Sequence, residues 1–435
     1  MKKFAKLSVL VAMAIILSFA SLGCVFLSPK QESEIPEIIA QAHNVVINSG
    51  VSERQKMDRV DAIEKVSRSV VAITMEDGSG SGVIVNVQRT DENGQNIDDD
   101  TVFYILTCFH VVQGKGDINV YLPDTEGDNW GESDYNENYC FTGKIGGSFT
   151  DPVTLIGGDQ TSDIAVLRLN VAGSAVSKDN IVKANLAPST GYTMKVGEDV
   201  FAIGNPSGIL PGSVTVGTIG YINREVVISG IGDMTLIQLN TDIYHGSSGG
   251  ALFNLYGEVI GITNSGSDSY IGIGYAIPFA VNSAEDLKDS GFINITKQLL
   301  GSYTGTNYGY VSGRMEKFGF TCQAIDEADG GGVKVAYLTE GSQASKSSMA
   351  VGDIVKQVRI LRYKGMSGGS KTYETGQLID IDSLSKLSQA IQTLEINDVL
   401  EVNLIRISGK SQTSLLVRFT AKQFYFCDTG VYPNS

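Results

Sequence analysis

Apolar residues in the middle of this chain fall in short runs separated by glycine, asparagine and aspartate. Residues 102–112 and 163–169 are such runs, and the stretch over residues 181–222 continues the pattern with turns at several glycines. Many short strands with turns of this kind are typical of an all-β barrel domain. The chain is therefore predicted to be mainly β.

Two stretches have the apolar spacing of amphipathic helices instead. The first covers residues 55–70 and leads into a strand over residues 70–74. The second covers residues 381–394 and precedes a strand-like run over residues 398–406. A further helix is expected over residues 279–287.

The first 27 residues are expected to lie outside the fold. Three lysines precede an apolar run over residues 7–27, which is the pattern of a secretion signal. Ser21-Leu22-Gly23-Cys24 resembles a bacterial lipoprotein cleavage box with Cys24 as the lipidated residue, although the usual leucine is displaced by one position. The run, at roughly 20 residues, is also long enough for a transmembrane anchor. We favour the lipoprotein. Whether lipidated, anchored or fully secreted, the rest of the chain is expected outside the cytoplasm, and residues 28–54 are expected to be a linker.

Length and charge set broad limits on domain number and partners. A chain of 435 residues suggests about three structural units. The net charge is −15, so nucleic acid is not expected as a partner and a membrane is expected only through the N-terminal segment. The acidic balance favours solubility and could favour basic substrates.

The chain has five cysteines, whose spacing indicates neither a metal site nor a disulfide-rich scaffold. They are Cys24, Cys108, Cys140, Cys322 and Cys427. Two disulfides could form if Cys24 carries lipid, but buried or free thiols are the preferred interpretation.

A glycine- and serine-rich stretch, His245-Gly246-Ser247-Ser248-Gly249-Gly250, has the composition of a nucleophile loop. Its glycines allow backbone angles and close approaches that a Cβ would block. Backbone N–H groups could then point at a developing oxyanion next to the Ser248 hydroxyl. Because the chain contains many Gly/Ser turns, this interpretation needs a base and an acid elsewhere.

Three histidines compete for the role of base. His43 lies in a polar N-terminal stretch, and His245 is too close to Ser248 on the same loop to reach across its hydroxyl. His110 ends a strand-like run, where a rigid scaffold could present it. Asp163 begins an apolar strand, and a buried carboxylate needs a partner such as imidazole.

These segments resemble the trypsin-like serine proteases, and specifically the HtrA/DegP family. Leu106-Thr107-Cys108-Phe109-His110-Val111-Val112 resembles the family's Leu-Thr-Asn-x-His-Val-Val, and Asp163-Ile164-Ala165-Val166-Leu167 resembles its Asp-Leu-Ala-Val-Leu. Further matches over residues 201–206, 257–262 and 272–278 follow in the same order. The resemblance covers roughly residues 55–300 and implies a chymotrypsin-like double β-barrel with the active site between the barrels.

The resemblance also implies roles for individual residues. His110 would be the general base, Asp163 would hold its tautomer, and Ser248 would be the nucleophile, with the N–H groups of Gly246 and Ser248 as the oxyanion hole. No metal and no organic cofactor are expected.

Two departures from the family pattern limit what can be transferred. Ser247 stands where the family usually has asparagine, and Asp242 lies six residues before Ser248 where the family's aspartate lies eight before its serine. Asp242 could sit at the base of the specificity pocket and favour lysine or arginine. A strand residue pointing elsewhere is an equally open interpretation.

Residues 305–422 are expected to form a PDZ-like α+β domain. Residues 332–344 and 349–355 resemble a PDZ domain of the kind attached to these proteases. Such a domain binds an extended peptide at a sheet edge, with its terminal carboxylate held by backbone N–H groups. Phe318-Gly319-Phe320 is the preferred carboxylate loop and Tyr308-Gly309-Tyr310 the alternative, and either could also be a packed aromatic turn. Residues 363–374 look like an insertion, and residues 423–435 are an unassigned tail.

Together these features predict a serine endopeptidase that acts on misfolded or unfolded extracytoplasmic proteins. The PDZ-like domain would bind peptide C-termini for substrate capture or activation. The competing hypothesis is a proteolytically silent peptide-binding chaperone or sensor. The resemblance also implies a trimer or larger homo-oligomer.

Overall fold

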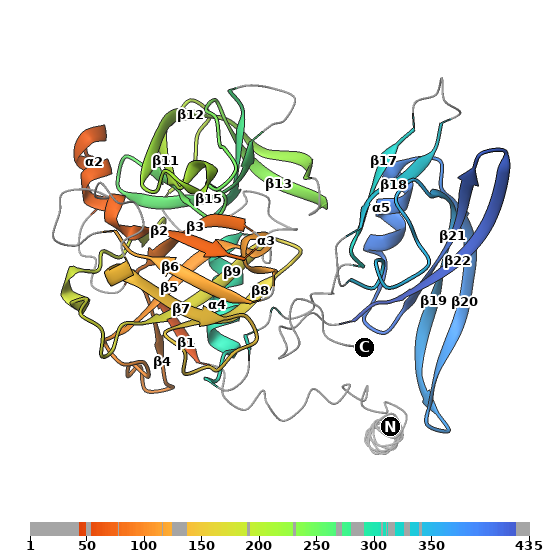
Figure 1. The fold of residues 1–435 in the computed structure, drawn as a ribbon, viewed down its shortest axis with the longest axis horizontal. Helices are drawn as coiled ribbons and strands as arrows, with labels where there is room; N and C mark the ends of the chain where they lie inside the picture. Colours follow the sequence, from red (N-terminus) through yellow and green to blue (C-terminus); the bar gives the residue numbers. More distant parts are fainter. Residues whose placement is uncertain are drawn as a thin grey trace, which may run out of the picture. The chain divides into compact units, whose positions relative to one another are not determined.

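A computed structural model describes most of the chain that follows the N-terminal segment (Figure 1). The described residues are 43–48, 54–76, 78–114, 116–123, 137–188, 192–228, 232–266, 272–279, 291–305, 308, 309, 311, 318–325, 331–338 and 342–422. The expected signal segment with Cys24, most of the linker over residues 28–54, nearly all of the helix expected over residues 279–287, and the tail lie outside these residues. None of the described helices is long and apolar enough to cross a membrane.

Seven strands close a first barrel in the order β2-β3-β5-β9-β8-β7-β6. They are β2 (Val70–Met75), β3 (Gly78–Val85), β5 (Val102–Cys108), β6 (Asp117–Tyr121), β7 (Cys140–Lys144), β8 (Val153–Asp159) and β9 (Ile164–Asn170). Side chains such as Ile73, Ile84, Ile105 and Leu167 are fully or almost fully buried in one apolar cluster. The alternation of apolar residues along these strands therefore fills the barrel interior.

Seven further strands form a second sheet in the order β10-β15-β14-β11-β12-β13-β16. They are β10 (Asn185–Leu186), β11 (Asp199–Gly204), β12 (Ser213–Ile228), β13 (Gly232–Leu239), β14 (Ala251–Asn254), β15 (Glu258–Gly266) and β16 (Gly274–Pro278). An additional pairing of β15 with β16 joins the two sides of this sheet into a ring.

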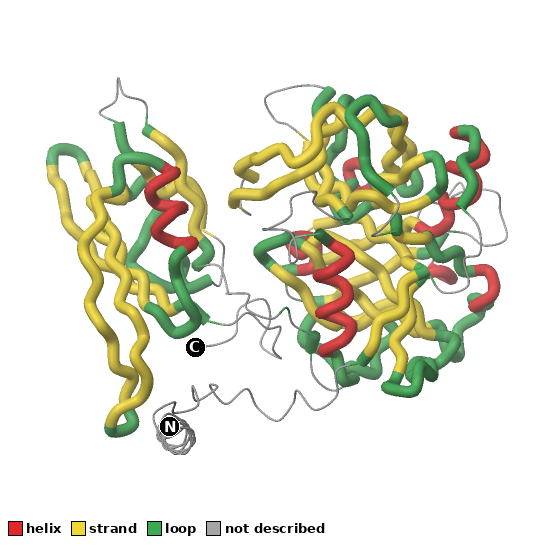
Figure 2. The backbone as a smooth tube through the Cα atoms, turned by 180° about the vertical axis from the view of Figure 1, so that it is seen from behind, coloured by secondary structure: helices red, strands yellow, loops and turns green. Residues whose placement is uncertain are grey.

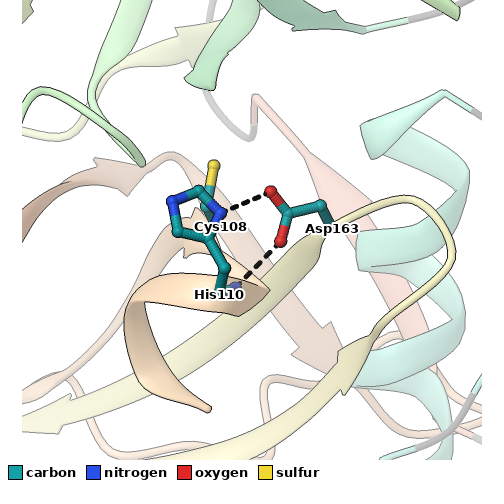
Figure 3. Close-up of side chains that lie close together, drawn as sticks. All are labelled: Cys108, His110 and Asp163. Carbon is teal, nitrogen blue, oxygen red and sulfur yellow. Dashed lines mark hydrogen bonds and ion pairs between the residues drawn. The ribbon is translucent and has the colours of Figure 1, made fainter. Parts of the chain in front are cut away.

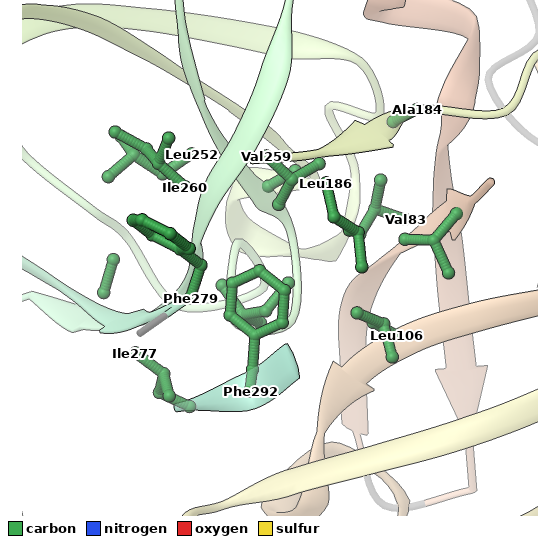
Figure 4. Close-up of a cluster of buried hydrophobic side chains, with 14 of the residues drawn as sticks. Val83, Leu106, Ala184, Leu186, Leu252, Val259, Ile260, Ile277, Phe279 and Phe292 are labelled. Carbon is green, nitrogen blue, oxygen red and sulfur yellow. The ribbon is translucent and has the colours of Figure 1, made fainter. Parts of the chain in front are cut away.

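The two barrels share one apolar cluster (Figure 4). Val83 and Leu106 from the first barrel and Leu252 and Val259 from the second are all buried in it. Because this core is continuous across the barrels, elements from both can hold side chains in fixed positions at their junction. The prediction of a mainly β chain with a trypsin-like double barrel is confirmed.

Several short elements flank the barrels. They are β1 (Asn44–Ile47), β4 (Val87–Thr90), α2 (Arg59–Val66), α3 (Phe109–Val112), α4 (Phe292–Ser302) and the 3₁₀ turns at Ser67–Ser69, Glu137–Tyr139, Lys178–Asn180 and Pro206–Gly208. The carboxylate of Asp58 caps α2 by accepting from the N–H groups of Val60 and Asp61. The helical spacing seen over residues 55–70 thus yields a helix that is shorter than the pattern.

Two predicted boundaries differ from the structure. Residues 44–47 were expected to be linker, but they pair with β4 in an antiparallel ladder. At the other end, the second unit was expected from residue 305, but the N–H of Gly309 donates to the carbonyl of Ile156 at 2.6 Å and Val311 is buried in the barrel cluster. Backbone pairing with distant strands decides both boundaries, and local composition does not reveal it.

A separate sheet follows, in the order β17-β18-β19-β21-β22 with β20 paired to β19 (Figure 2). Its elements are β17 (Phe320–Ala324), β18 (Val333–Leu338), β19 (Ile354–Ser367), β20 (Ser370–Asp380), β21 (Val399–Ser408), β22 (Ser411–Thr420) and α5 (Leu384–Gln392). Val358, Leu387, Leu400 and Phe419 pack in a core of its own. The expected insertion over residues 363–374 is the outer part of the β19–β20 hairpin, in which Tyr363 faces Tyr373.

Candidate active site

His110 and Asp163 lie together in the first barrel (Figure 3). Strand β5 ends at Cys108, and the single turn of α3 that follows carries His110. The ring Nδ1 of His110 lies 2.7 Å from Asp163 Oδ2, and the backbone N–H of His110 donates to Asp163 Oδ1 at 2.8 Å. Two contacts to one carboxylate fix both the position and the orientation of the imidazole.

Asp163 occupies the turn between β8 and β9 in a left-handed conformation, with φ of 56°. Aspartate is among the few residues other than glycine that tolerate this region. Its carbonyl accepts from the N–H of Phe109 at 3.0 Å, so the backbone of the turn is tied to the start of α3. The turn and the helix therefore hold acid and base as one unit.

Asn264, on β15 of the second barrel, completes the surroundings of Asp163. Its Nδ2 donates to Asp163 Oδ2 at 2.6 Å, which gives the carboxylate a third hydrogen bond. Asp163 is only 1% exposed, and a buried carboxylate needs such donors to remain charged. Sequence reasoning missed Asn264, although an asparagine that follows the apolar run Val259–Ile262 was a usable signal.

The surroundings of His110 act on its pKa in opposite directions. Burial disfavours the charged imidazolium and lowers the pKa, but the charge of Asp163 and its hydrogen bond raise it by more. The net result is a pKa above the usual value for histidine. The ring keeps one open side, since the side chain is 27% exposed.

The Ser248 loop packs tightly against the first barrel. Gly246 and Gly249 have φ values of 90° and 84°, which residues with a Cβ rarely adopt. A Cβ on Gly249 would lie 2.1 Å from the carbonyl oxygen of Ser81 and 2.2 Å from Thr107 Oγ1. Glycine is therefore required at this position both for the turn and for the approach to β3 and β5.

The hydroxyl of Ser248 is hydrogen-bonded to a backbone carbonyl. It donates to the backbone carbonyl of Asn264 at 2.5 Å, and no hydrogen bond joins it to the imidazole in the described part of the chain. Asn264 thus contacts two of the three predicted residues, through its amide to Asp163 and through its carbonyl to Ser248.

The carbonyl groups that precede Gly246 and Ser248 point into the protein. The carbonyl of His245 accepts from the N–H of Ser207, and that of Ser247 accepts from Gly250 N–H and Thr263 Oγ1. In a trans peptide the N–H points opposite to the carbonyl. The N–H groups of Gly246 and Ser248 therefore face away from these interior donors, and neither has an acceptor among the described residues.

Asp242 lies at the start of the same loop and is partly buried. Its Oδ1 accepts from the N–H of Gly272 at 2.6 Å, and its Oδ2 accepts from the hydroxyl of Tyr244 at 3.2 Å. Both oxygens thus have local donors. Its role in substrate preference stays a prediction.

In the C-terminal sheet, Phe318-Gly319-Phe320 leads into β17. The ring of Phe318 is 4% exposed and stacks on Phe419 with centroids 5.3 Å apart, so this side chain belongs to the core. Gly319 has φ of 81°, and the carbonyl of Phe318 accepts from Ala344 N–H at 2.9 Å. Of the alternative loop, Gly309 packs on α4 and pairs with Gly157 of the first barrel.

Three of the cysteines fall among the described residues, and Cys108, Cys140 and Cys322 are all free thiols. This confirms the preferred interpretation for these three. Cys108 is fully buried next to the acid and base, and its Sγ lies 3.3 Å from the carbonyl oxygen of Thr263. Burial and then the charge of Asp163 raise the pKa of its thiol well above the usual value.

Comparison with known proteins finds serine proteases. Residues 80–262 match the family model for a trypsin-like peptidase domain. The "Serine protease Do-like HtrA" of Bacillus subtilis is 30% identical over 78% of this chain and 63% of that protein. The "Probable periplasmic serine endoprotease DegP-like" of Pseudomonas savastanoi is 28% identical over 75% of this chain and 62% of that protein. The chain thus spans less than two thirds of the length of these two relatives.

Two further matches cover more of the other protein. The "Serine protease Do-like HtrA" of Lactococcus lactis is 26% identical over 84% of both chains. The crystal structure of a serine endoprotease from Yersinia pestis matches 85% of this chain and 99% of that chain, with 21% identity and a TM-score of 0.40. Residues 80–262 of the chain therefore match a trypsin-like peptidase domain, and the chain is similar to HtrA/DegP serine proteases.

Proposed function

We propose that this chain is a serine endopeptidase in which His110, Asp163 and Ser248 act as a catalytic triad. The observation that carries the proposal is the contact at 2.7 Å between buried Asp163 and partly exposed His110, beside a glycine loop that carries Ser248. The trypsin-like domain match and the names of the relatives support the same reaction class.

In this mechanism the Ser248 hydroxyl turns from the Asn264 carbonyl to His110 Nε2. As Oγ attacks the peptide carbonyl carbon, its proton passes to Nε2, and Asp163 stabilises the imidazolium that forms. The carbonyl π electrons move to oxygen, and the N–H groups of Gly246 and Ser248 stabilise that oxyanion, at about 3 kcal/mol per donor. The imidazolium then protonates the leaving amine, and a water molecule releases the acyl group by the same route.

The proposed substrates are misfolded or unfolded extracytoplasmic proteins. Relatives from Pseudomonas, Halomonas and Chlamydia are named as periplasmic endoproteases, and the N-terminal sequence has the pattern of a secretion signal. We place the chain outside the cytoplasm for these reasons, with lipid on Cys24 as the preferred anchor. A trimer or larger assembly remains an expectation from the resemblance alone.

We infer that the C-terminal sheet is a PDZ-like domain that binds peptide C-termini. Among the described strands, β17 pairs only with β18, so its other edge is available for an added strand. The left-handed Gly319 at the start of β17 supports a carboxylate site at its backbone, while Phe318 supports the loop from the core. Bound peptide could supply substrate or favour the active orientation of Ser248.

One observation favours the competing function of a silent peptide-binding chaperone or sensor. The Ser248 hydroxyl donates to Asn264 and not to His110. However, catalytic hydrogen bonds are often unmade without substrate, so this orientation does not outweigh the acid–base pair.

Casein hydrolysis and fluorophosphonate labelling by the full chain would test the proposal. Both should be lost in Ser248→Ala and retained in Ser247→Ala, which removes a neighbouring hydroxyl for which no hydrogen bond is found among the described residues. Hydrolysis that survives in Ser248→Ala would contradict the proposal. Absence of both signals in the folded wild type, with and without added C-terminal peptides, would favour the silent binding protein.

A further inference from the structure

Cys108, the residue before α3, places a thiol beside the carboxylate of Asp163 and the imidazole of His110. Cys108 Sγ, a ring nitrogen of His110 and a carboxylate oxygen of Asp163 all lie within 4.8 Å of one another (Figure 3). They form the one group of three metal-ligating side chains at such distances among the described residues. The proteolytic mechanism uses His110 and Asp163 but gives Cys108 no role.

Thiolate, imidazole and carboxylate are the three ligand types that Zn²⁺ takes in proteins. With bonds of about 2.0 to 2.3 Å, a tetrahedral Zn²⁺ holds its ligand atoms about 3.3 to 3.6 Å apart. In the structure, His110 Nδ1 and Asp163 Oδ2 are closer than this spacing, at 2.7 Å. All three ligand atoms lie within 4.8 Å of one another, which is somewhat wider than this spacing. Shifts of well under about 2 Å, largely in the partly exposed His110 ring, would let all three atoms bond to one Zn²⁺ ion.

A fourth ligand is available from Asn264. The residue is only 1% exposed, and its Oδ1 has no hydrogen-bond partner among the described residues. Its Nδ2 lies 2.6 Å from Asp163 Oδ2 and 3.9 Å from Cys108 Sγ. A half-turn of the amide would exchange the two atoms and direct the unpartnered oxygen at the cluster. The half-turn gives up the hydrogen bond from Nδ2 to Asp163, and a cation bonded to both the amide oxygen and the Asp163 carboxylate would replace it.

We propose that Cys108, His110 and Asp163, with Asn264 as fourth ligand, form a binding site for a thiophilic divalent cation such as Zn²⁺ that switches the enzyme off. Binding releases the thiol proton, and the two charges of the cation face the Cys108 thiolate and the Asp163 carboxylate. The site is then neutral overall, which suits its burial. The inhibitory part of this inference rests on the proposed triad, whereas cation binding does not.

Inhibition follows from the tautomer of His110. In the triad Nδ1–H donates to Asp163, and the lone pair of Nε2 accepts the Ser248 proton. A cation on Nδ1 needs the lone pair there, so the ring proton moves to Nε2. The nitrogen that must accept the Ser248 proton is then already protonated, and the cation replaces the hydrogen bond to Asp163.

The cation would enter from the exposed side of the imidazole. Cys108 and Asp163 are 0% and 1% exposed, whereas the His110 side chain is 27% exposed. In the structure the ring has no hydrogen bond to Ser248, so it is held through Asp163 and its own backbone contact. Outward rotation of the ring opens the cluster, and a covalent adduct on Ser248 that contacts the ring would oppose that rotation.

Cobalt binding to the full-length Ser248→Ala chain tests the site without any need for proteolysis. Co²⁺ should produce a thiolate-to-metal charge-transfer band together with tetrahedral ligand-field bands, and Zn²⁺ should displace it. The band should persist in Cys140→Ser and Cys322→Ser, and disappear in Cys108→Ala. A band retained in Cys108→Ala, or no band in the Ser248→Ala parent, would overturn the proposal.

Two further measurements complete the test. If Cys108→Ala does not fold, a chain with the other four cysteines changed to serine answers the same question, since a thiolate band then requires Cys108 and its absence refutes the site. In the active wild type, Zn²⁺ should inhibit at concentrations at least about 10-fold lower than in Cys108→Ala, because losing outer-shell support alone costs about 10- to 100-fold in affinity. Equal inhibition of both proteins would contradict the switch. A cobalt band in Ser248→Ala, combined with a folded wild type that hydrolyses no substrate, would contradict the proposed protease but not the cation site.

Discussion

The two halves of the candidate site differ in how far they are assembled. In the first barrel, Asp163 accepts from the backbone and the ring of His110 and from Asn264, so acid and base are already in place. In the second barrel, the backbone of the Ser248 loop is held by interior hydrogen bonds, but its hydroxyl faces Asn264. In the proposed triad the contact between Asp163 and His110 is therefore already made, whereas the Ser248 hydroxyl would have to leave the Asn264 carbonyl.

Replacing the base should have the largest effect. His110→Ala should lower kcat by about 10⁴- to 10⁶-fold, because Ser248 would lose its proton acceptor. His245→Ala is the matched control, since His245 is exposed on the Ser248 loop and only its backbone carbonyl is used. Initial rates on a quenched peptide measure both variants. Comparable losses in the two variants would mean that the structure assigns the base wrongly.

Asp163→Asn should lower kcat/KM by about 10⁴-fold and also change its pH dependence. The neutral imidazole is the active form, so in the wild type activity should rise with pH through a midpoint above about 6.5. Asp163 raises the pKa of His110 against the lowering by burial, so in Asp163→Asn the midpoint should move down. Asparagine tolerates the left-handed backbone of this turn.

The pH profile is the readout that separates Asp163 from a merely structural residue. Folding of the variant is checked by its thermal unfolding at one pH. An unchanged midpoint would show that the carboxylate does not control the imidazole.

Asn264→Ala should have an intermediate effect. It removes one of three donors to the Asp163 carboxylate, and a hydrogen bond to a charged group is worth about 1.5 to 3 kcal/mol, or roughly 10- to 100-fold in rate. The loss should fall on kcat with KM little changed, because Asn264 positions the acid and its side chain is buried. Steady-state kinetics give both constants. A loss confined to KM would instead place Asn264 in substrate binding.

Asp242→Asn should have the smallest effect. Both carboxylate oxygens already accept from Gly272 and Tyr244, so we expect the ratio of cleavage after lysine to cleavage after valine to change by less than about 10-fold. A mixed peptide library measures this ratio for both proteins. Loss of cleavage after basic residues by about 100-fold would place Asp242 at the base of the specificity pocket.

Local patterns in the sequence predicted a mainly β chain with a barrel domain, α2, α5 and the segments that carry His110 and Asp163, whereas the double barrel was implied by the family resemblance. These features depend on periodicity and on residue types within one segment. Asn264 could not be assigned in this way, because its hydrogen bonds join β15 to a turn 101 residues earlier. The pairing of residues 44–47 with β4 is non-local for the same reason.

The orientation of the Ser248 hydroxyl was equally beyond sequence reasoning. It depends on the Asn264 carbonyl, which lies 16 residues further along the chain and accepts from this hydroxyl. Cys108 gives a further example. Its burial was expected, but its closeness to Asp163 depends on the register in which β5 pairs with β9, and this register is not visible in the sequence.

The pH dependence of fluorophosphonate labelling tests the central claim most directly, because it reports the reactivity of Ser248 without a protein substrate. The account predicts an adduct on Ser248 whose formation rate rises with pH through a midpoint above about 6.5 and is lost in His110→Ala. An adduct on another residue, or labelling of Ser248 that is independent of both pH and His110, would contradict it.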